Sequence, residues 1–280
     1  MTDSRVRIAP VRRIGASAPV LAASAPALSD TDLLAVEEPL MLEIEHGPPA
    51  GRVRVNAGVI LRTPGLDEDL ATGLLFAEGF ITSSRAIDGF ETPSPGHLRV
   101  HIAEGMPLDD RLARRMLARA SACGLCGRDA IDDLAGLGGQ SLPRGPHVTA
   151  AVLRSLPARL RERQAVFNET GGLHAAAFFD VDGGFIAAAE DIGRHNAVDK
   201  LIGAQLRTRA SPAAPAILVV SGRAAFEIVH KAVMARVPVL AAVGAPSSLA
   251  VETARAFNLT LAGFLREDRF NIYSGFDRIV

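Results

Sequence analysis

Residues 216–265, AILVVSGRAAFEIVHKAVMARVPVLAAVGAPSSLAVETARAFNLTLAGFL, decide the fold. They contain three continuous apolar runs, 216–220, 237–243 and 259–265, which are typical of strands buried on both faces of a sheet. The two segments between these runs predict helices, so the order is strand, helix, strand, helix, strand. This order predicts right-handed crossovers and a parallel sheet, and therefore an α/β protein.

Upstream of this unit, residues 39–45 and 53–61 predict two strands joined by a turn. A helix follows from Thr63-Pro64 to Gly79, with acidic residues in its first turn, where the helix dipole favours negative charge. These elements predict a smaller β/α lobe, and the Gly- and Pro-rich stretch 136–148 predicts its boundary. The expected organisation is a mobile N-terminal arm at 1–35, an N-terminal lobe with the cysteine pair at 36–145, and a C-terminal α/β lobe at 146–280.

The composition argues against several classes of partner. The chain has 280 residues and a formal net charge of -1, so bulk electrostatics give no basis for binding nucleic acid or a membrane surface. Aromatic residues make up 5% of the chain, which disfavours a base-stacking surface for nucleic acid. The N-terminal arm contains no apolar run of signal-peptide length, and no segment reaches the ~20 apolar residues of a membrane span. We therefore expect a cytoplasmic protein.

The chain's two cysteines, Cys123 and Cys126, lie in the sequence Cys-Gly-Leu-Cys. A disulfide within that motif would close almost no loop and would stabilise little, so a reactive role is favoured over a structural one. A predicted amphipathic helix at 111–120 carries four arginines just before the pair, and cations lower the pKa of a nearby thiol. The pattern indicates thiol or sulfur chemistry.

Other roles compete for the cysteine pair. One alternative is that the two cysteines have no chemical role and lie in a loop after a solvent-exposed basic helix. Structural zinc needs four ligands, which two thiols could supply only across a dimer, and the sequence leaves that open. A zinc-dependent deaminase needs a His-x-Glu motif and a Pro-Cys-x-x-Cys motif. The chain has no His-x-Glu, and Ala122 stands where the second motif requires proline. A thioredoxin-like oxidoreductase would place the pair between a strand and a helix of a shorter domain.

A second polar cluster, residues 190–200, follows a predicted strand at 184–189 and opens a helix. Backbone amides at a helix start bind anions, and Arg194 and His195 would add positive charge and hydrogen-bond donors. An ordinary polar turn with one capping acid fits the same residues. His174 lies in a separate glycine-rich stretch and by itself is more typical of a histidine at the edge of a core.

Polar residues also gather where the three predicted parallel strands end, at Ser221-Gly222-Arg223, at 244–248 and at 264–269. Open parallel sheets bind ligands in the crevice beyond the carboxyl ends of their strands, and Gly, Ser and Arg there suit phosphate oxygens. The chain contains neither the dinucleotide Gly-x-Gly-x-x-Gly nor the phosphate-loop Gly-x-x-x-x-Gly-Lys. These residues therefore have two possible interpretations: a site for a phosphorylated or dinucleotide-like ligand, or loops that only connect the strands to the helices.

Seven segments follow one another along the chain in a recognisable order: Glu37 to Leu40, Gly73 to Ile81, Cys123 to Gly127, Thr170 to Ala176, Glu190 to Lys200, Ser221 to Arg223 and Asn258 to Phe264. Together they resemble the formate dehydrogenase accessory sulfurtransferase family, FdhD, over roughly residues 36–280. One departure is Leu173, where threonine is common before the histidine, and it weakens a hydroxyl role at that position.

The resemblance implies a cytidine-deaminase-like fold, a layered sheet with helices on both faces, in a homodimer without zinc chemistry. It implies a sulfurtransferase that accepts sulfur from a cysteine desulfurase and passes it to the bis-molybdopterin guanine dinucleotide cofactor of formate dehydrogenase, with molybdenum or tungsten. Cys123 matches the persulfide-carrying cysteine and Cys126 its partner. The matching cofactor-binding residues are Phe264, Leu265, Arg266, Glu267, Asp268 and Arg269.

The residues and the resemblance lead to one hypothesis. A persulfide forms on Cys123 by thiol exchange, and the guanine dinucleotide ends of the cofactor lie in the strand-end crevice, where guanine nucleotide would mimic them. A non-catalytic cofactor-binding chaperone and a thiol–disulfide oxidoreductase are the alternatives. Besides the C-terminal segment, the residues expected to contact the cofactor are Arg194, His195, Ser221 and Arg223.

Overall fold

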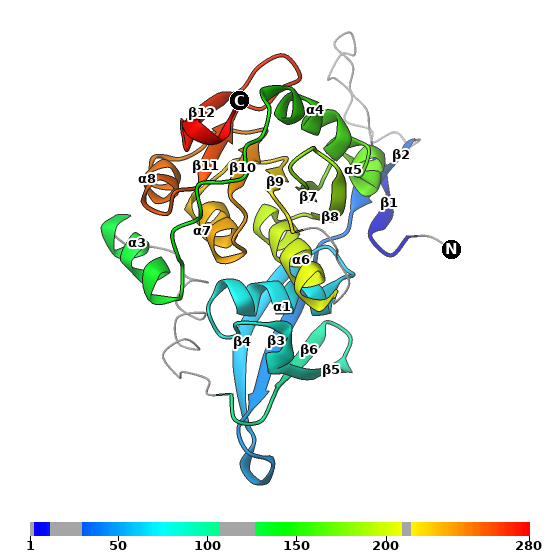
Figure 1. Cartoon of the computed structure of the whole chain (residues 1–280). Helices are drawn as coiled ribbons and strands as arrows, with labels where there is room; N and C mark the ends of the chain where they lie inside the picture. Colours follow the sequence, from blue (N-terminus) through cyan, green and yellow to red (C-terminus); the bar gives the residue numbers. More distant parts are fainter. Residues whose placement is uncertain (1–2, 12–29, 107–126, 209–213) are drawn as a thin grey trace.

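Figure 1 shows the computed structural model, which describes residues 3–11, 30–106, 127–208 and 214–280. The centre of the larger lobe is a six-stranded sheet made of β7 (His174–Phe179), β8 (Phe185–Asp191), β9 (Ile217–Val220), β10 (Val239–Ala242), β11 (Thr260–Gly263) and β12 (Asn271–Ser274). Their spatial order is β12-β11-β10-β9-β7-β8. Strands β9, β10 and β11 run parallel to one another, so the predicted parallel unit is confirmed. Strands β7, β8 and β12 pair antiparallel with their neighbours.

Strands β10 and β11 begin later than the apolar runs that predict them, because the first residues of those runs close the preceding helices. Helix α7 (Phe226–Met234) is followed by Arg236 in the left-handed conformation, with φ of 56°. The backbone N–H of Val237 then donates to the Ala232 carbonyl at 3.0 Å. Val237 is therefore part of a helix C-terminus, and β10 begins only at Val239.

Helices cover both faces of the larger sheet, as predicted. In β9, Leu218 and Val220 belong to the core beneath α7, whereas Ile217 and Val219 belong to the core on the opposite face. The first core also contains Leu134, so the packing of the larger lobe begins before residue 146. On the same face as α7, the larger lobe has helices α3 (Gly127–Gly136), α6 (Arg194–Arg207) and α8 (Ser248–Ala256). Helix α4 (Ala150–Arg161) packs on the opposite face, and α5 (Ala165–Thr170) follows it.

In the part of the chain that the structure describes, the smaller lobe is a four-stranded sheet with helix α1 packed on one face. Its strands are β3 (Glu38–His46), β4 (Val53–Arg62), β5 (Ile87–Ser94) and β6 (His97–Ile102), in the order β4-β3-β6-β5. Leu40, Leu42 and Ile44 of β3 are buried against helix α1 (Asp67–Ala77). The predicted strands and helix are confirmed, but α1 begins after Leu66, whose φ of 57° is left-handed. The described residues also form short 3-10 helices at η1 (Pro49–Gly51), η2 (Ser84–Ala86) and η3 (Phe276–Arg278).

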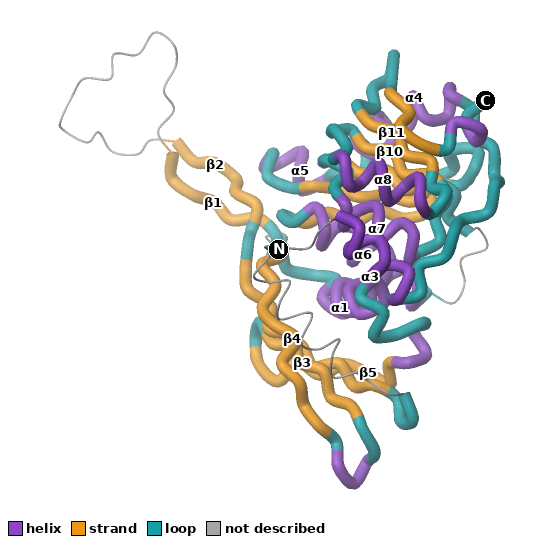
Figure 2. Tube along the Cα trace, turned by 90° about the vertical axis from the view of Figure 1, so that its left-hand side faces the viewer, coloured by secondary structure: helices purple, strands orange, loops and turns teal. Residues whose placement is uncertain are grey.

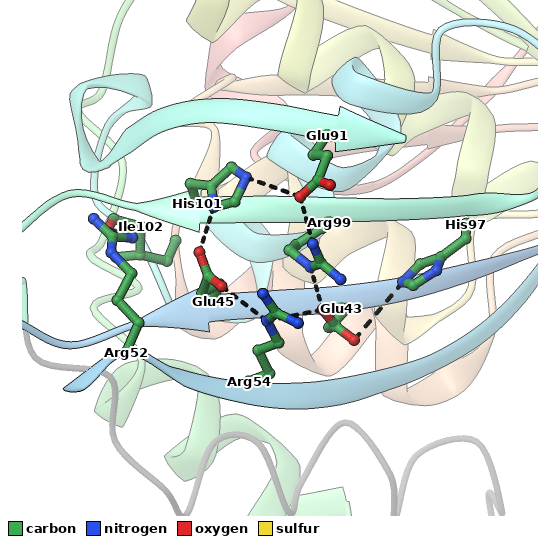
Figure 3. A network of polar contacts seen from close by, with 9 residues as sticks. All are labelled: Glu43, Glu45, Arg52, Arg54, Glu91, His97, Arg99, His101 and Ile102. Atoms are coloured by element: carbon green, nitrogen blue, oxygen red, sulfur yellow. Dashed lines mark hydrogen bonds and ion pairs between the residues drawn. The ribbon is translucent and has the colours of Figure 1, made fainter. Parts of the chain in front are cut away.

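The other face of the smaller sheet carries a network of charged side chains (Figure 3). Arg54 donates to Glu45 at 2.8 Å, and His101 Nδ1 lies 2.7 Å from the same carboxylate. The hydrogen bond from Arg54, followed by the contact with His101, lowers the pKa of Glu45. Arg99 pairs with Glu43 on the neighbouring strand. These charges pair with one another across the strands.

A two-stranded antiparallel sheet lies at the side of the molecule, beyond the smaller sheet (Figure 2). It consists of β1 (Val6–Val11) and β2 (Asp30–Ala35), within the stretch expected to be an arm. A mobile arm was expected here, whereas the two segments pair as strands, and Pro10 is tolerated because both strands of a two-stranded sheet are edge strands. The hairpin meets the larger lobe where the Ala35 side chain approaches Gly172.

The two lobes meet where helices α1 and α6 cross at a pair of glycines. A Cβ atom added to Gly73 would lie 1.9 Å from the Asp199 carbonyl oxygen, and one added to Gly203 would lie 1.9 Å from the Asp69 carbonyl oxygen. Both atoms would collide with main chain that cannot move aside. The helices therefore touch backbone to backbone, and the lobes form one packed unit.

We predict that Gly203→Ala lowers the free energy of unfolding by about 3 kcal/mol or more, because it pushes two helix backbones apart. Gly136→Ala is the matched control, since a Cβ there meets nothing within 4 Å. Urea denaturation of both variants measures the effect. Equal midpoints would show that the crossing tolerates a larger separation.

Candidate functional site

One edge of the larger sheet brings together the polar clusters that the sequence singles out. The parallel strands β9, β10 and β11 end at this edge, and β7, which is antiparallel to β9, begins there. Strand β8 also ends there, because His174 pairs with Asp191. Residues 190–195, 221–223, 244–248 and 264–269 therefore follow neighbouring strands at one edge, as predicted for a ligand crevice.

The loops at this edge are bound to one another through their backbones. Gly244 N–H donates to the Gly222 carbonyl at 2.9 Å, and Phe264 N–H donates to the Gly244 carbonyl at 3.0 Å. A Cβ on Gly244 would lie 2.8 Å from the Gly222 oxygen, so only glycine fits between the neighbouring loops. Ser221 is fixed in the same way: its N–H donates to the Ala175 carbonyl, and its Oγ accepts from Ala175 N–H, both at 2.9 Å. The Ser221 hydroxyl proton remains available for a ligand.

A cleft of about 980 Å³ opens beside this edge. Ser221 and Glu267 line it, as does His174, which the sequence alone treated as a core-edge residue. One wall comes from the end of α4 and from α5, which sequence reasoning missed, because nothing in the spacing of α4 shows that it ends beside the strand termini. The residues of this wall are Pro157, Ala158, Leu160, Arg161, Glu162, Gln164, Phe167 and Asn168.

A second pocket of about 260 Å³ is lined by Phe264, Arg266, Arg269 and Asn271. Phe264 is 44% exposed and has a φ of 53°, a strained left-handed conformation for an aromatic residue. Arg266 Nη1 donates to the Val243 carbonyl at 2.8 Å, so part of this guanidinium holds the loop in place.

The remaining residues of the predicted C-terminal segment differ in exposure. Leu265 has no exposed surface and belongs to the core on the α4 side, so only its backbone could contact a ligand. Asp268 and Arg269 are largely exposed and lie 3.5 Å apart as an ion pair. Arg223 is exposed at the end of β9.

Much of the cluster at residues 190–200 is structural. Asp191 is fully buried and pairs with Lys200 at 2.7 Å. Lys200 also donates to the Thr63 carbonyl at 2.7 Å, and Thr63 N–H donates to Asp191 at 3.1 Å. Burial lowers the pKa of Lys200, while Asp191 acts in the opposite direction. The ion pair thus ties the end of β4 to the sheet edge, and it joins the two lobes there.

Arg194 and His195, which the sequence placed in one site, face different surroundings. Arg194 Cδ and the ring of His174 lie beside Gly222, where an added Cβ would be 3.5 Å and 3.3 Å from them. Burial lowers the pKa of His174, and Arg194 lowers it further, so both favour the neutral imidazole. His195 Nε2 instead lies 2.9 Å from Glu227 and lines a separate cavity of about 190 Å³ between the lobes. His195 is therefore not brought together with the cleft residues.

The cavity between the lobes predicts a specific pH dependence of stability. Burial raises the pKa of Asp199 from 3.8 to about 6, although Lys231, 2.6 Å away, acts in the opposite direction. Between these values the folded state holds a proton that the unfolded state has lost, so this group makes stability fall as the pH rises towards 6. Above about pH 6 its contribution is constant.

We expect the stability of the wild type relative to Asp199→Asn to decrease by on the order of 2–3 kcal/mol between about pH 4 and about pH 6.5. Urea titrations of the two proteins across this range measure the difference. A difference that does not change with pH would contradict the assignment.

The predicted persulfide cysteine and its partner, Cys123 and Cys126, lie outside the described residues, as does the basic helix predicted before them. Among the residues that the structure describes, no group of three or more His, Asp or Glu side chains is arranged to hold a metal ion. Within the same residues, no helix is long and apolar enough to cross a membrane.

Comparisons with known proteins agree with this fold. A crystal structure described as that of a formate dehydrogenase accessory protein from Desulfotalea psychrophila superimposes with a TM-score of 0.68, at 21% identity, over 90% of this chain and 92% of that chain. This likeness defines the class of fold: the chain has the fold of that protein.

Sequence comparison gives the family. The model of the FdhD/NarQ family matches residues 35–280. A protein from Nocardia farcinica named sulfur carrier protein FdhD is 46% identical over 261 residues, which is 89% of this chain and 88% of that protein. One of the same name from Thermoplasma acidophilum is 43% identical over 261 residues, 90% of this chain and 89% of that protein. The chain belongs to the FdhD/NarQ family.

Proposed function

We propose that this protein is a sulfur carrier that serves a formate dehydrogenase, by holding sulfur as a persulfide on Cys123 and delivering it to the bis-molybdopterin guanine dinucleotide cofactor. The main support is its membership of the FdhD/NarQ family over residues 35–280, a range that includes the Cys-Gly-Leu-Cys motif. Relatives bear the name sulfur carrier protein, and the structural neighbour is called a formate dehydrogenase accessory protein. A cysteine desulfurase is the proposed sulfur donor, the cytoplasm the proposed location and a homodimer the proposed assembly.

The proposed first step is a thiol exchange. The Cys123 thiolate attacks the outer sulfur of a persulfide on the desulfurase, so one sulfur–sulfur bond forms as another breaks. The outer sulfur keeps its proton, and the desulfurase cysteine leaves as a thiolate. For release, Cys126 as a thiolate attacks the inner sulfur, which expels hydrosulfide towards the cofactor and leaves a disulfide between the two cysteines. A thiol reductant then restores the pair.

The strand-end crevice suits the cofactor as a substrate. The cleft of about 980 Å³ lies at the upper end of the range for ligand pockets, and a bis-dinucleotide would fill it and extend beyond it. Ser221 offers a hydroxyl proton, and the guanidinium groups of Arg266 and Arg269 lie in the adjacent pocket. Such donors bind phosphate oxygens. The chain's own residues therefore would bind and orient the ligand, while the cysteines carry the sulfur.

We predict that incubation with a cysteine desulfurase and cysteine adds the mass of one sulfur to the wild-type protein and none to Cys123→Ala. Cys126→Ala is the matched control and should still gain sulfur, because the thiolate at position 123 remains. Mass spectrometry of the intact proteins measures the addition. Sulfur on Cys123→Ala would refute the assignment. If replacing both cysteines left activation of formate dehydrogenase intact, the protein would be a non-catalytic cofactor-binding chaperone.

We also predict that GDP, as a mimic of one end of the cofactor, binds the wild type and binds Arg269→Ala about threefold to tenfold more weakly. The reason is the loss of one partly solvated guanidinium contact to phosphate. Arg85→Ala, at an exposed arginine of the smaller lobe, is the control and should bind GDP normally. Isothermal titration calorimetry at fixed salt measures the affinities. Equal affinity of both variants would remove the C-terminal segment from the site.

A further inference from the structure

The cavity between the lobes contains polar groups that the proposed function does not use. It has a volume of about 190 Å³, and both lobes contribute to its wall. In this wall, Ile60 of β4 and Leu74 of α1 are half-buried apolar side chains, and α6 and α7 supply polar ones. The start of α6 separates the cavity from the strand-end cleft, because Arg194 lies beside Gly222 whereas His195 lines the cavity.

The frame of this cavity is fixed on two sides. Helices α1 and α6 touch backbone to backbone at Gly73 and Gly203. On the side of α7, His230 Nε2 donates to the Ala77 carbonyl at the end of α1 over 2.8 Å. The cavity is therefore formed before a ligand arrives, and it suits a rigid ring better than a ligand that needs the lobes to move.

Asp199 and Lys231 are a buried acceptor and a buried donor that line this cavity with unused bonding capacity. Asp199 is 2% exposed and Lys231 is 5% exposed. Lys231 Nζ donates to Asp199 Oδ1 at 2.6 Å, and among the described residues neither side chain makes another hydrogen bond. An ammonium has three donors and a carboxylate accepts on both oxygens, so N–H groups of Lys231 and Oδ2 of Asp199 remain for a ligand. Buried polar groups of this kind call for partners.

Asn196 adds an acceptor to the same wall. Its Nδ2 donates to the Leu61 carbonyl at 2.8 Å and to Asp191 Oδ1 at 2.9 Å. Both partners only accept hydrogen bonds, so they fix the orientation of the amide and use both of its protons. The group that Asn196 still offers is its carbonyl oxygen, which accepts from a donor on a ligand.

These groups specify the edge of a ring. The donor Lys231 beside the acceptor Asp199 matches a carbonyl oxygen beside an N–H group, and Asn196 matches a further N–H donor. The 2-amino-4-oxo edge of a pterin carries a carbonyl, an N–H and an amino group in this order. The cavity is smaller than the roughly 300 Å³ at which pockets for drug-sized ligands begin, so it suits a bicyclic ring rather than a whole nucleotide. The carboxylates of Glu78 and Glu227 also line it and disfavour a phosphate there.

Given the proposed function, we infer that the cavity between the lobes binds a pterin ring of the cofactor. Lys231 donates to the 4-oxo group, Asp199 accepts from the ring N3–H, and Asn196 accepts from the 2-amino group. The site is separate from the strand-end cleft, but Arg194 at the cleft and His195 at the cavity are consecutive residues. A ligand with a pterin at one end and phosphates at the other therefore has a place for each end on either side of one turn.

Binding of 6-hydroxymethylpterin, followed by quenching of its fluorescence, tests this inference at about pH 7, where Asp199 is ionised. The wild type should bind it. Asp199→Asn should bind about tenfold or more weakly, because an amide N–H then faces the ring N3–H. Lumazine, which has a carbonyl in place of the 2-amino group, should bind the wild type about tenfold more weakly, because it turns an acceptor towards Asn196.

A pair of leucine variants locates the bound ring. Leu74→Phe should abolish binding by filling the cavity. Leu206→Phe changes another half-buried leucine, at the end of α6 and outside the cavity, and should bind like the wild type. Circular dichroism of the variants checks that they are folded. An excess of GDP should not displace the pterin, because guanine carries the same ring edge but its nucleotide is expected in the cleft.

The outcomes separate this inference from the proposed function. If the wild type binds GDP but no 6-hydroxymethylpterin, or if GDP displaces the pterin, the inference is wrong and the proposed function stands. Equal binding of pterin and lumazine by the wild type also overturns it, and this comparison needs no variant to fold. If the pterin binds as expected while Cys123 gains no sulfur, the inference stands and the proposed sulfur chemistry fails.

Discussion

The buried ion pair between Asp191 and Lys200 is the interaction on which the arrangement of the molecule depends. Each partner is nearly or fully inaccessible, and both bind the backbone of Thr63 at the end of β4. A buried charge without its partner is costly, so this contact holds only when β4, β8 and α6 are all in place. It therefore couples formation of the smaller lobe to formation of the sheet edge where the cleft lies.

Residues 190–200, which contain this ion pair, serve three purposes. Within residues 190–200, Asp191 and Lys200 point inward and hold the lobes, whereas Arg194 lies at the helix start beside Gly222. Glu190, one residue before the ion pair, fixes the start of α5. A single strand-to-helix turn thus joins the lobes, supports one wall of the cleft and brings a cation to its edge.

The parallel unit could be predicted from its sequence, because strands buried on both faces need continuous apolar runs such as 216–220, and such runs are visible in the sequence. The convergence of Ser221, Gly244 and Phe264 followed from topology, since parallel strands end at one edge. The α4–α5 wall could not be predicted, because the placement of Phe167 depends on a hydrogen bond that its backbone N–H donates to the Glu190 carboxylate, 23 residues further along the chain. His195 was grouped with Arg194 on sequence proximity, but successive positions on a helix point about 100° apart.

The glycine contact between α1 and α6 has a consequence for how a large ligand reaches the cleft. Enzymes often admit substrate by rotating one lobe away from another about a hinge. Here the two helix axes lie so close that rotation would either separate main chain from main chain or drive carbonyl oxygens into Gly73 and Gly203. Entry and exit must then rely on the loops at the sheet edge, while the scaffold beneath them stays rigid.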